Sequence, residues 1–407
     1  MRSFRKFAEG AAAVCLLLFL SEAVRYLLLN PRGEGSTVLA DDPFRRPAHA
    51  IIYAVVLIAF LTQPKVAFSA MRRAWAFWLL SALAVASVYW SISPSASLRA
   101  AIGISATGLL GMFFDLNFSV REQLRLLAIA LTVVMLASIA FALLPPYLGL
   151  EQTIHQGAWR GAYPQKNALG RAMALAVPVF ALLLADAGRR KPFVFAAMVF
   201  AASLAALSQS ATAPIVIAAL ALLIPLFITL RSRRFSASTV AAGASVGVVI
   251  LGVLVFTYSD LLLEVLGRDA SLSGRPLLWF ALLPEIMTRP FLGFGISAFW
   301  NGGTGASAVV AGIVRWKPVH AHNGFIDVIL DTGFVGLAVL LLGIAIAARR
   351  ALVHIQTKVS VLEAAWPAAF LVFFVLSNMS ESSILRPYTI FWFLYSSIFT
   401  RVTRRDS

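Results

Sequence analysis

The residues best suited to chemistry are two histidines, His320 and His322, that stand two positions apart before an apolar segment. A neutral imidazole titrates near neutral pH, so it is able to take a proton from a hydroxyl group as a general base. Two histidines also suit zinc, but zinc needs a third ligand and the usual spacings of zinc ligands are absent. A simpler alternative is that His322 and Asn323 only cap the helix that follows.

Acidic residues lie close to the histidines and extend these alternatives. Asp327 and Asp331 stand four residues apart, on one face of the predicted helix. A charged side chain within a membrane span is a functional hypothesis by default. Asp327 lies about one turn from His322 and is placed to orient it, whereas Asp331 equally suits a structural pair with an arginine. A third metal ligand would come from Asp327, Asp331, Glu381 or His155.

Basic residues gather in two segments that precede or surround these groups. They are Arg160, Lys166, Arg268, Arg275, Arg289, Arg315 and Lys317. Arginine binds phosphate groups through two parallel hydrogen bonds, so this pattern indicates an anionic ligand. The alternative is that long loops cross a membrane regardless of their charge. The count of basic residues alone leaves both interpretations open.

The composition requires a membrane to explain it. Of 407 residues, 60% are hydrophobic and only 13% are charged, about half the charged fraction of a soluble domain. Lysine and arginine outnumber aspartate and glutamate by 34 to 18, but they cluster in short loops between apolar runs. This excess is therefore explained by membrane topology rather than by nucleic acid. The single cysteine, Cys15, excludes an internal disulfide.

We predict an all-α polytopic integral membrane protein with about 12 transmembrane helices. The expected spans are 9–29, 48–63, 74–92, 98–117, 122–145, 168–187, 192–209, 211–230, 237–257, 324–347, 361–378 and 388–401. The first is expected to be a retained helix rather than a signal peptide. With a cytoplasmic N-terminus, every inward segment carries at least two basic residues. Both termini are therefore expected in the cytoplasm.

Two outer segments of this single membrane domain, 1–407, are expected to form the site. The first is the loop 146–167, and the second is the large periplasmic loop 258–323, which is longer than a connector needs. Within it, RPLLWFALLPEIMTRP from Arg275 has apolar residues at helical spacing. It predicts a short amphipathic helix on the membrane interface, anchored by Trp279 and broken or kinked at Pro284. The glycine-rich stretch that follows predicts a loop.

A longer pattern starts at the second histidine. His322 and Asn323 are followed by Gly333 and Gly336, so the stretch reads HNx9GxxG. Other agreeing stretches are RGAYPQKNALG at 160–170, GRPLLW at 274–279 and RPFLGFG at 289–295. Together they resemble the O-antigen ligase and polymerase superfamily of bacterial envelope proteins, over about residues 150–385. GRDASLSGRPLLW and RPFLGFGISAFW, with Leu-Ala-Val after Gly336, are more similar to its exopolysaccharide polymerase branch.

The resemblance implies a metal-independent, inverting glycosyltransferase that acts on glycans carried by undecaprenyl diphosphate. It assigns His322 as the base that activates the acceptor hydroxyl and Arg275 as the ligand of the donor diphosphate. The further expected substrate-binding residues are Arg160, Arg289, Lys166 and Asn323. As supporting residues we add Asp327, Arg268, His320 and Glu381. No cofactor, metal or nucleic acid is expected.

Three functions follow as hypotheses. The first is a polymerase that joins lipid-linked repeats into exopolysaccharide or O-antigen at the periplasmic face of the inner membrane. The second is a ligase that transfers the lipid-linked glycan to lipid A-core. The third is a polysaccharide or glycolipid transporter, which usually holds its charges at midplane in related halves. The lipid bilayer is an expected partner of the chain, and a chain-length regulator is a further candidate.

Overall fold

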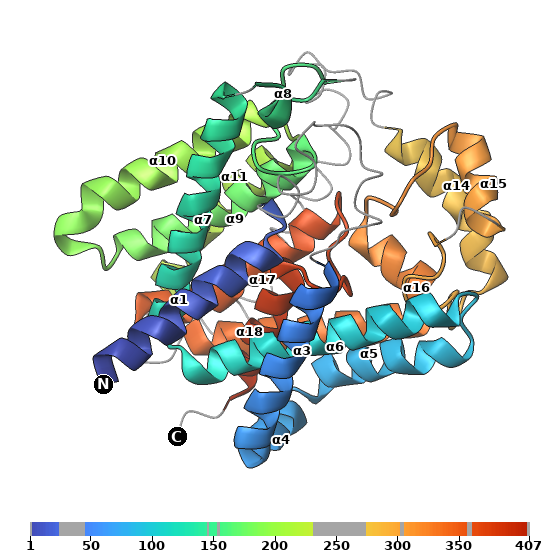
Figure 1. Cartoon of the computed structure of the whole chain (residues 1–407), viewed down its shortest axis with the longest axis horizontal. Helices are drawn as coiled ribbons and strands as arrows, with labels where there is room; N and C mark the ends of the chain where they lie inside the picture. The colour runs from blue at the N-terminus through green and yellow to red at the C-terminus, as the bar shows by residue number, and fades with distance from the viewer. Residues whose placement is uncertain are drawn as a thin grey trace. The chain divides into compact units, whose positions relative to one another are not determined.

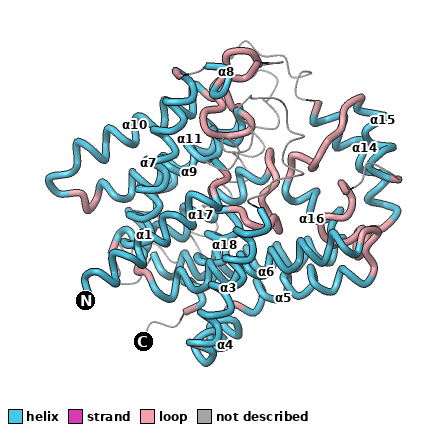
Figure 2. The backbone as a smooth tube through the Cα atoms, viewed as in Figure 1, coloured by secondary structure: helices cyan, strands magenta, loops and turns pink. Residues whose placement is uncertain are grey.

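The computed structural model describes residues 2–23, 45–144, 146–152, 155–230, 274–301, 305–355 and 360–404. Within these ranges every regular element is a helix, apart from an isolated antiparallel bridge between Leu150 and Trp159 (Figure 2). The predicted all-α class is therefore confirmed for the described part of the chain. The predicted span 237–257 and Arg268 lie outside the described residues.

The chain divides into two compact units, which are described separately. The first comprises residues 1–55, 114–237 and 351–373, and the second comprises 56–113, 238–350 and 374–407. The helices mainly in the first unit are α1 (Arg2–Leu20), α7 (Val120–Leu143), α8 (Pro146–Gly149), α9 (Lys166–Leu184), η3 (Gly188–Arg190), α10 (Lys191–Leu207), α11 (Thr212–Leu230) and α17 (Val361–Asn378). Those mainly in the second are α4 (Pro64–Arg73), α5 (Trp75–Ala86), η2 (Ser87–Tyr89), α6 (Pro94–Asn117), α14 (Arg275–Thr288), α15 (Ala306–Val314), α16 (Gly324–Ile355) and α18 (Ile390–Thr403). Helix α3 (Arg45–Thr62) contributes to both.

The helices agree with a multi-pass membrane protein. In the described ranges, 6 helices are long and apolar enough to cross a bilayer: α6, α7, α9, η3 with α10, α16 and α17. A seventh candidate is the pair α3 and α4, which is bent by 100° at its break. The other predicted spans in the described ranges coincide with shorter or less apolar helices. The finding supports the membrane assignment without fixing the count of spans.

In the first unit, α9 packs against α10, α11 and α7, and α7 also packs against α1 and α8 (Figure 1). A tight hairpin joins α10, which ends at Leu207, to α11, which begins at Thr212. Gly170 of α9 lies against this hairpin, where an added Cβ would come within 2.4 Å of Ser210 Cβ. Small residues of this kind let helices approach closely within a membrane.

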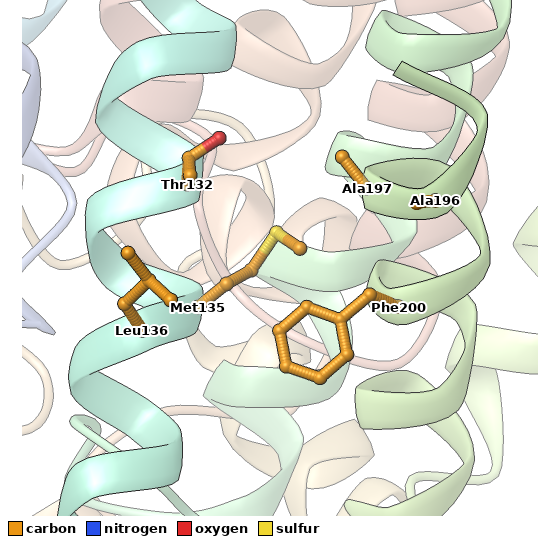
Figure 3. A pocket seen from close by; sticks show the side chains of 6 residues that line it. All are labelled: Thr132, Met135, Leu136, Ala196, Ala197 and Phe200. Atoms are coloured by element: carbon orange, nitrogen blue, oxygen red, sulfur yellow. The ribbon is translucent and has the colours of Figure 1, made fainter. Parts of the chain in front are cut away.

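An apolar pocket lies between α7 and α10 of the first unit. Its volume is about 230 Å³. The side chains that line it are Thr132, Met135, Leu136, Ala196, Ala197 and Phe200 (Figure 3). The Thr132 hydroxyl donates to the Ala128 carbonyl of its own helix at 2.8 Å, so the lining presents hydrocarbon and no titratable side chain.

In the second unit, α18 packs against α6 and the aromatic side chains of α5. A Cβ added at Gly111 of α6 would come within 2.2 Å of the Phe393 carbonyl oxygen, so only glycine permits this approach. Phe77 of α5 stacks on Trp392 of α18, with ring centroids 4.9 Å apart. Trp392 is fully buried, and its indole N–H donates to the Ile104 carbonyl at 3.2 Å. These contacts build a rigid frame from side chains far apart in sequence.

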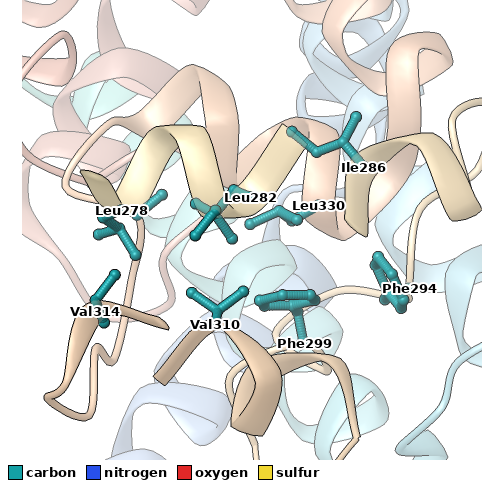
Figure 4. Packing of buried hydrophobic residues seen from close by; sticks show 10 residues of the cluster. Leu278, Leu282, Ile286, Phe294, Phe299, Val310, Val314 and Leu330 are labelled. Atoms are coloured by element: carbon teal, nitrogen blue, oxygen red, sulfur yellow. The ribbon is translucent and has the colours of Figure 1, made fainter. Parts of the chain in front are cut away.

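Helix α14 confirms the predicted short helix. It runs through Pro284 to Thr288, so the proline does not end the helix. One side packs on α15 in a buried cluster whose labelled members include Leu278, Leu282, Ile286, Phe299 and Val310 (Figure 4). The opposite side is apolar and exposed at Phe280, Leu283 and Met287. Helix α15 was not predicted, since the sequence indicated only a glycine-rich loop there.

Candidate active site

The segment that carries the two histidines enters α16 through an asparagine cap. The Asn323 side-chain oxygen accepts from the amides of Phe325 and Ile326 at 3.0 and 3.2 Å. Its amide nitrogen donates to the Met379 carbonyl at 3.3 Å. These bonds stabilise the first turn of α16, which is why the helix begins at Gly324. Of the two roles left open for Asn323, the structure displays the capping role.

His322 stands on a strained backbone just before this cap. Its φ is +50°, in the left-handed region that costs a non-glycine residue energy and that clusters at functional sites. Its side chain is 17% exposed, and Nδ1 lies 3.6 Å from the Glu381 Oε1 atom. Its ring also faces Trp316, with centroids 5.9 Å apart. His322 is thus a partly open imidazole beside a carboxylate, as a general base requires.

His320 supports His322 rather than duplicating it. Their ring centroids are 4.0 Å apart, and the backbone N–H of His322 donates to His320 Nδ1 at 3.1 Å. Because Nδ1 accepts this bond, the neutral ring carries its proton on Nε2. Burial, together with the neighbouring His322, lowers the pKa of His320 to about 4. His320 therefore remains neutral at physiological pH and holds the backbone of His322.

Glu381 joins the histidine to an arginine. Arg275 Nη2 donates to Glu381 Oε1 at 3.0 Å, and their side chains are 21% and 6% exposed. Burial alone would raise the pKa of the Glu381 carboxyl, but His322 and the Arg275 guanidinium hold that pKa well below its usual range. Glu381 is therefore ionised. Arg275, the first residue of α14, is brought to His322 across a wide separation in sequence.

A second ion pair lies behind the histidines. Arg386 Nη2 is 2.9 Å from Asp327 Oδ2, and Asp327 is 1% exposed. Asp327 Oδ1 also accepts from the Trp300 indole at 2.8 Å and from the backbone amide of Ala321 at 3.1 Å. Ala321 is the residue between His320 and His322. The predicted orienting role of Asp327 thus has a physical route, through the backbone of the histidine segment.

Trp279 secures the same residue from the other side. Its indole N–H donates to the Ala321 carbonyl at 2.8 Å. Ala321 is fully buried, so both of its backbone polar groups gain partners that water cannot supply. The anchoring of α14 in the membrane interface by Trp279 stays a prediction, and the structure adds a contact through which Trp279 ties α14 to the histidine segment.

Gly333 breaks α16 and does more than permit close packing. Its φ of +68° and ψ of −170° are not helical, so backbone groups on both sides of it lose their partners within α16. The segment 290–295 replaces them. Phe294 and Gly295 amides donate to the carbonyls of Leu330 and Asp331 at 2.7 and 3.0 Å, and the Phe334 amide donates to the Pro290 carbonyl at 2.7 Å. A Cβ on Gly333 would come within 2.1 Å of Phe291.

The connection between α5 and α6 holds that segment in turn. The Ile92 amide donates to the Phe294 carbonyl at 3.0 Å, and the Trp90 indole donates to the Leu292 carbonyl at 2.8 Å. Ser97 Oγ donates to the Ile296 carbonyl at 2.7 Å. Sequence analysis gave this connection no role, because it carries no acidic, basic or histidine side chain.

Arg289 is not brought to the Arg275 cluster. The two arginines flank the 14-residue helix α14, whose rise separates them by about 20 Å. Arg289 Nη1 instead donates to the Trp90 carbonyl at 3.3 Å, and its guanidinium lies 5.5 Å from the Phe294 ring. The two arginines lie apart because α14 stays continuous through Pro284, and binding of the donor by Arg289 stays a prediction.

Arg160 and Lys166 belong to the first unit and are buried there, at 5% and 7% exposure. Arg160 Nη2 donates to the Tyr147 carbonyl at 3.0 Å. Lys166 Nζ donates to the Gln209 carbonyl at 3.3 Å, and its amide donates to Glu151 at 2.9 Å. Arg160 thus lies in a folded loop, and Lys166 begins the helix after it and contacts the α10–α11 hairpin.

Three side chains of the second unit have the residue types of a metal site. The ligand atoms of His320, His322 and Glu381 lie within 4.8 Å of one another, so Glu381 supplies the third ligand that the sequence left open. However, Glu381 already pairs with the Arg275 guanidinium at 3.0 Å, and that positive charge opposes a cation. The His320 Nδ1 atom is also occupied by a backbone amide. The cluster suits acid–base chemistry and an anion better than a metal ion.

Comparisons with known proteins agree with this geometry. A family model described as O-antigen ligase matches residues 196–341, which include Arg275, His322 and Gly333. The predicted resemblance to the O-antigen ligase family is confirmed. The chain is also 27% identical over 269 residues to the exopolysaccharide production protein ExoQ of Rhizobium meliloti (strain 1021). That alignment covers 62% of this chain and 60% of the relative, so it spans less than two thirds of the relative's length.

Two contacts of the site could not be predicted from the sequence. Arg386 was indicated, with Glu381, as a residue of the last outer loop that could join the site, but its pair with Asp327 was not foreseen. Trp300 belonged to an agreeing stretch, but its indole bond to Asp327 could not be inferred from the sequence. Both act through contacts between segments far apart in the chain, for which local spacing gives no signal.

Proposed function

We propose that this protein is a polymerase that joins undecaprenyl-diphosphate-linked oligosaccharide repeats into exopolysaccharide or O-antigen. The observation that carries the proposal is the cluster in which Glu381 lies 3.0 Å from Arg275 and 3.6 Å from His322. A cation for a diphosphate and a proton acceptor for a hydroxyl are the two groups that such a transfer needs. The similar protein ExoQ is named an exopolysaccharide production protein, which favours a polymerase over a ligase.

In the proposed reaction, the acceptor hydroxyl oxygen attacks the anomeric carbon of the donor sugar. The bond from that carbon to the diphosphate oxygen breaks, and its electron pair leaves with the diphosphate. The hydroxyl proton passes to His322, while Arg275 stabilises the charge on the leaving group. Attack opposite the leaving group inverts the anomeric carbon. Because diphosphate is a good leaving group, positioning and charge neutralisation suffice without a metal.

Other predicted residues keep defined places in the proposal. Asn323, His320 and Asp327 hold the base by capping α16 and fixing the histidine backbone. Arg160 and Lys166 are proposed as further ligands of the donor's anionic groups, and Arg268 as a supporting cation. We propose an active site at the periplasmic face of the bacterial inner membrane, with both termini in the cytoplasm. A chain-length regulator is the protein partner to be sought.

Purified protein supplied with an undecaprenyl-diphosphate oligosaccharide tests the proposal. We expect longer lipid-linked glycans from the wild type and a severe loss in His322→Ala and Arg275→Ala. Undiminished glycan transfer in both variants would refute the mechanism. If vesicles containing the protein move the lipid-linked sugar across the bilayer but make no longer glycan, the protein is a transporter instead.

The second candidate function is an O-antigen ligase, because the matching family model carries that description. A ligase would use the same base and cation and differ in its acceptor. Supplying purified lipid A-core beside the lipid-linked donor distinguishes the two. A ligase would join the glycan to lipid A-core, whereas a polymerase would extend the lipid-linked glycan and leave lipid A-core unmodified.

A further inference from the structure

One carboxylate oxygen lies next to both the proposed diphosphate ligand, Arg275, and the proposed base, His322. Glu381 Oε1 lies 3.0 Å from Arg275 Nη2 and 3.6 Å from His322 Nδ1. The first distance is that of a charge-assisted hydrogen bond, and the second is slightly longer than a hydrogen bond. In the free protein, the Glu381 carboxylate is therefore hydrogen-bonded to Arg275, while His322 lies beside it at the longer distance.

The backbone of Glu381 is fixed, so its side chain can change partner without a loop movement. The Glu381 amide donates to the Ser377 carbonyl at 3.1 Å. Its carbonyl accepts from the amide of Gly324, the first residue of α16, at 3.2 Å. The carboxylate is thus held at the start of the helix that His322 precedes, and only a small side-chain movement separates its two partners.

A diphosphate at Arg275 competes with Glu381 for the same guanidinium. Both ligands are anions, and arginine binds either through its planar N–H groups. The imidazole gains a proton during transfer and becomes a cation that a nearby carboxylate stabilises. Trp316 and neutral His320 also face the His322 ring, and neither supplies a negative charge. The carboxylate beside the His322 ring is that of Glu381, whose Oε1 atom lies 3.6 Å from His322 Nδ1.

We propose that Glu381 pairs with Arg275 in the free protein and passes to His322 when the donor diphosphate occupies Arg275. This inference rests on the proposed function. The exchange makes His322 a stronger base only when a donor is present. It also makes Glu381 a positioning residue with two opposed effects, because it weakens donor binding while it promotes transfer.

Glu381→Gln separates these effects. The amide keeps the shape but loses the charge, so undecaprenyl diphosphate, used as the probe, should bind about three- to tenfold more tightly. Glycan transfer should fall at least about tenfold, because the imidazolium loses its carboxylate. If Glu381 had only a structural role, Glu381→Gln would weaken both probe binding and glycan transfer. Probe affinity is measured by calorimetry in detergent, and transfer by glycan length on gels.

Glu285→Gln is the matched control. It removes the same charge from α14 of the same unit, and its position lies ten residues along the helix from Arg275. We expect probe affinity and transfer close to those of the wild type. A second control combines Glu381→Gln with Arg275→Ala, where the tighter binding should disappear because the competed guanidinium is gone.

The outcomes are distinct. If the wild type transfers glycan but Glu381→Gln binds the probe no more tightly, the partner exchange is refuted while the proposed function stands. If the wild type transfers no glycan, the proposed function fails first. Should Glu381→Gln not fold, Glu381→Asp is used, whose shorter carboxylate should give the same two changes with smaller size. Unchanged or weaker probe binding in that folded variant would equally refute the exchange.

Discussion

Two arginine–carboxylate pairs of the second unit look alike in distance and differ in surroundings. Arg386 lies 2.9 Å from Asp327, and Arg275 lies 3.0 Å from Glu381. Asp327 also accepts from an indole and a backbone amide, so it binds the histidine segment in place. Glu381 instead faces an ionisable ring at 3.6 Å. The first pair has the contacts of a structural support, and the second has those of a group that changes during a reaction.

The largest expected effect lies at the second pair. His322→Ala should reduce glycan transfer by about 10²–10⁴-fold, the usual contribution of a positioned general base. Thermal unfolding should change little, because the cap of α16 is made by Asn323. His354→Ala, at the far end of α16, is the control and should retain activity. Equal losses in both variants would show that the assay reports folding, and the comparison would lose its meaning.

Arg386→Ala should lower the free energy of unfolding by about 3–5 kcal/mol, because it leaves Asp327 buried without its cation. Arg275→Ala should cost less, because the buried Glu381 keeps His322 beside it at 3.6 Å as a second partner that can carry positive charge. Unfolding monitored in detergent measures both. Adding Asp327→Asn to Arg386→Ala should recover part of the loss. Equal destabilisation at the two arginines would erase the distinction between the pairs.

Arg275→Ala should reduce the kcat/KM of transfer by about 10²-fold, since one charge-assisted contact to the leaving group is lost. Arg275→Lys should recover only part of it, because lysine lacks the planar two-bond geometry. Arg289→Ala, at the other end of α14, should have a much smaller effect. A similar loss at Arg289 would support the expectation that both arginines bind one diphosphate.

The buried state of His320 predicts a pH effect on stability. Its pKa is lowered to about 4 in the fold, whereas the unfolded residue titrates near its ordinary value of 6.5. The unfolded chain therefore binds more protons between these values, and stability should fall as pH drops from about 6.5 towards 4, by about 1–2 kcal/mol at pH 5. His320→Asn should flatten this slope. Urea unfolding at several pH values measures it, and an equally steep slope in the variant would contradict the assignment.

The smallest expected effect is that of metal removal. Treatment with a chelator should leave glycan transfer unchanged, because the Arg275 charge beside Glu381 opposes a cation at this cluster. The assay is run with and without the chelator in metal-free buffer. A loss that zinc restores would instead make His320, His322 and Glu381 a metal site, and the Arg275–Glu381 pair would need a different interpretation.

The sequence predicted the helices well because each apolar run is long and continuous. It also singled out His322 and Arg275, since the HNx9GxxG pattern and the basic stretches resemble a known superfamily. The bonds of Asp327 to Trp300 and Arg386 could not be predicted, because they join segments with no common local period. The separation of Arg289 from Arg275 could not be predicted, because a proline late in a short helix does not reveal whether the helix continues.

Gly333 stood out in the sequence only as part of the HNx9GxxG pattern, whereas its role in the fold depends on segment 290–295. No pattern in a single segment shows that the carbonyls of Leu330 and Asp331 leave their helix for the amides of Phe294 and Gly295. Likewise, the α5–α6 connection supports the site through backbone carbonyls and serine hydroxyls. Reactive groups can be recognised in a sequence by their side chains. Backbone hydrogen bonds between distant segments cannot, because almost any residue can form them.

The break in α16 also constrains the order in which parts of the protein assemble. While α16 inserts, the backbone groups around Gly333 have no partners within their own helix, and each costs several kcal/mol in hydrocarbon. Segment 290–295 is synthesised earlier and supplies those partners. Stable insertion of α16 therefore requires segment 290–295 to dock first or together with it. A chain in which this segment misfolds would retain a poorly inserted span, which membrane quality control could recognise before an incomplete site was formed.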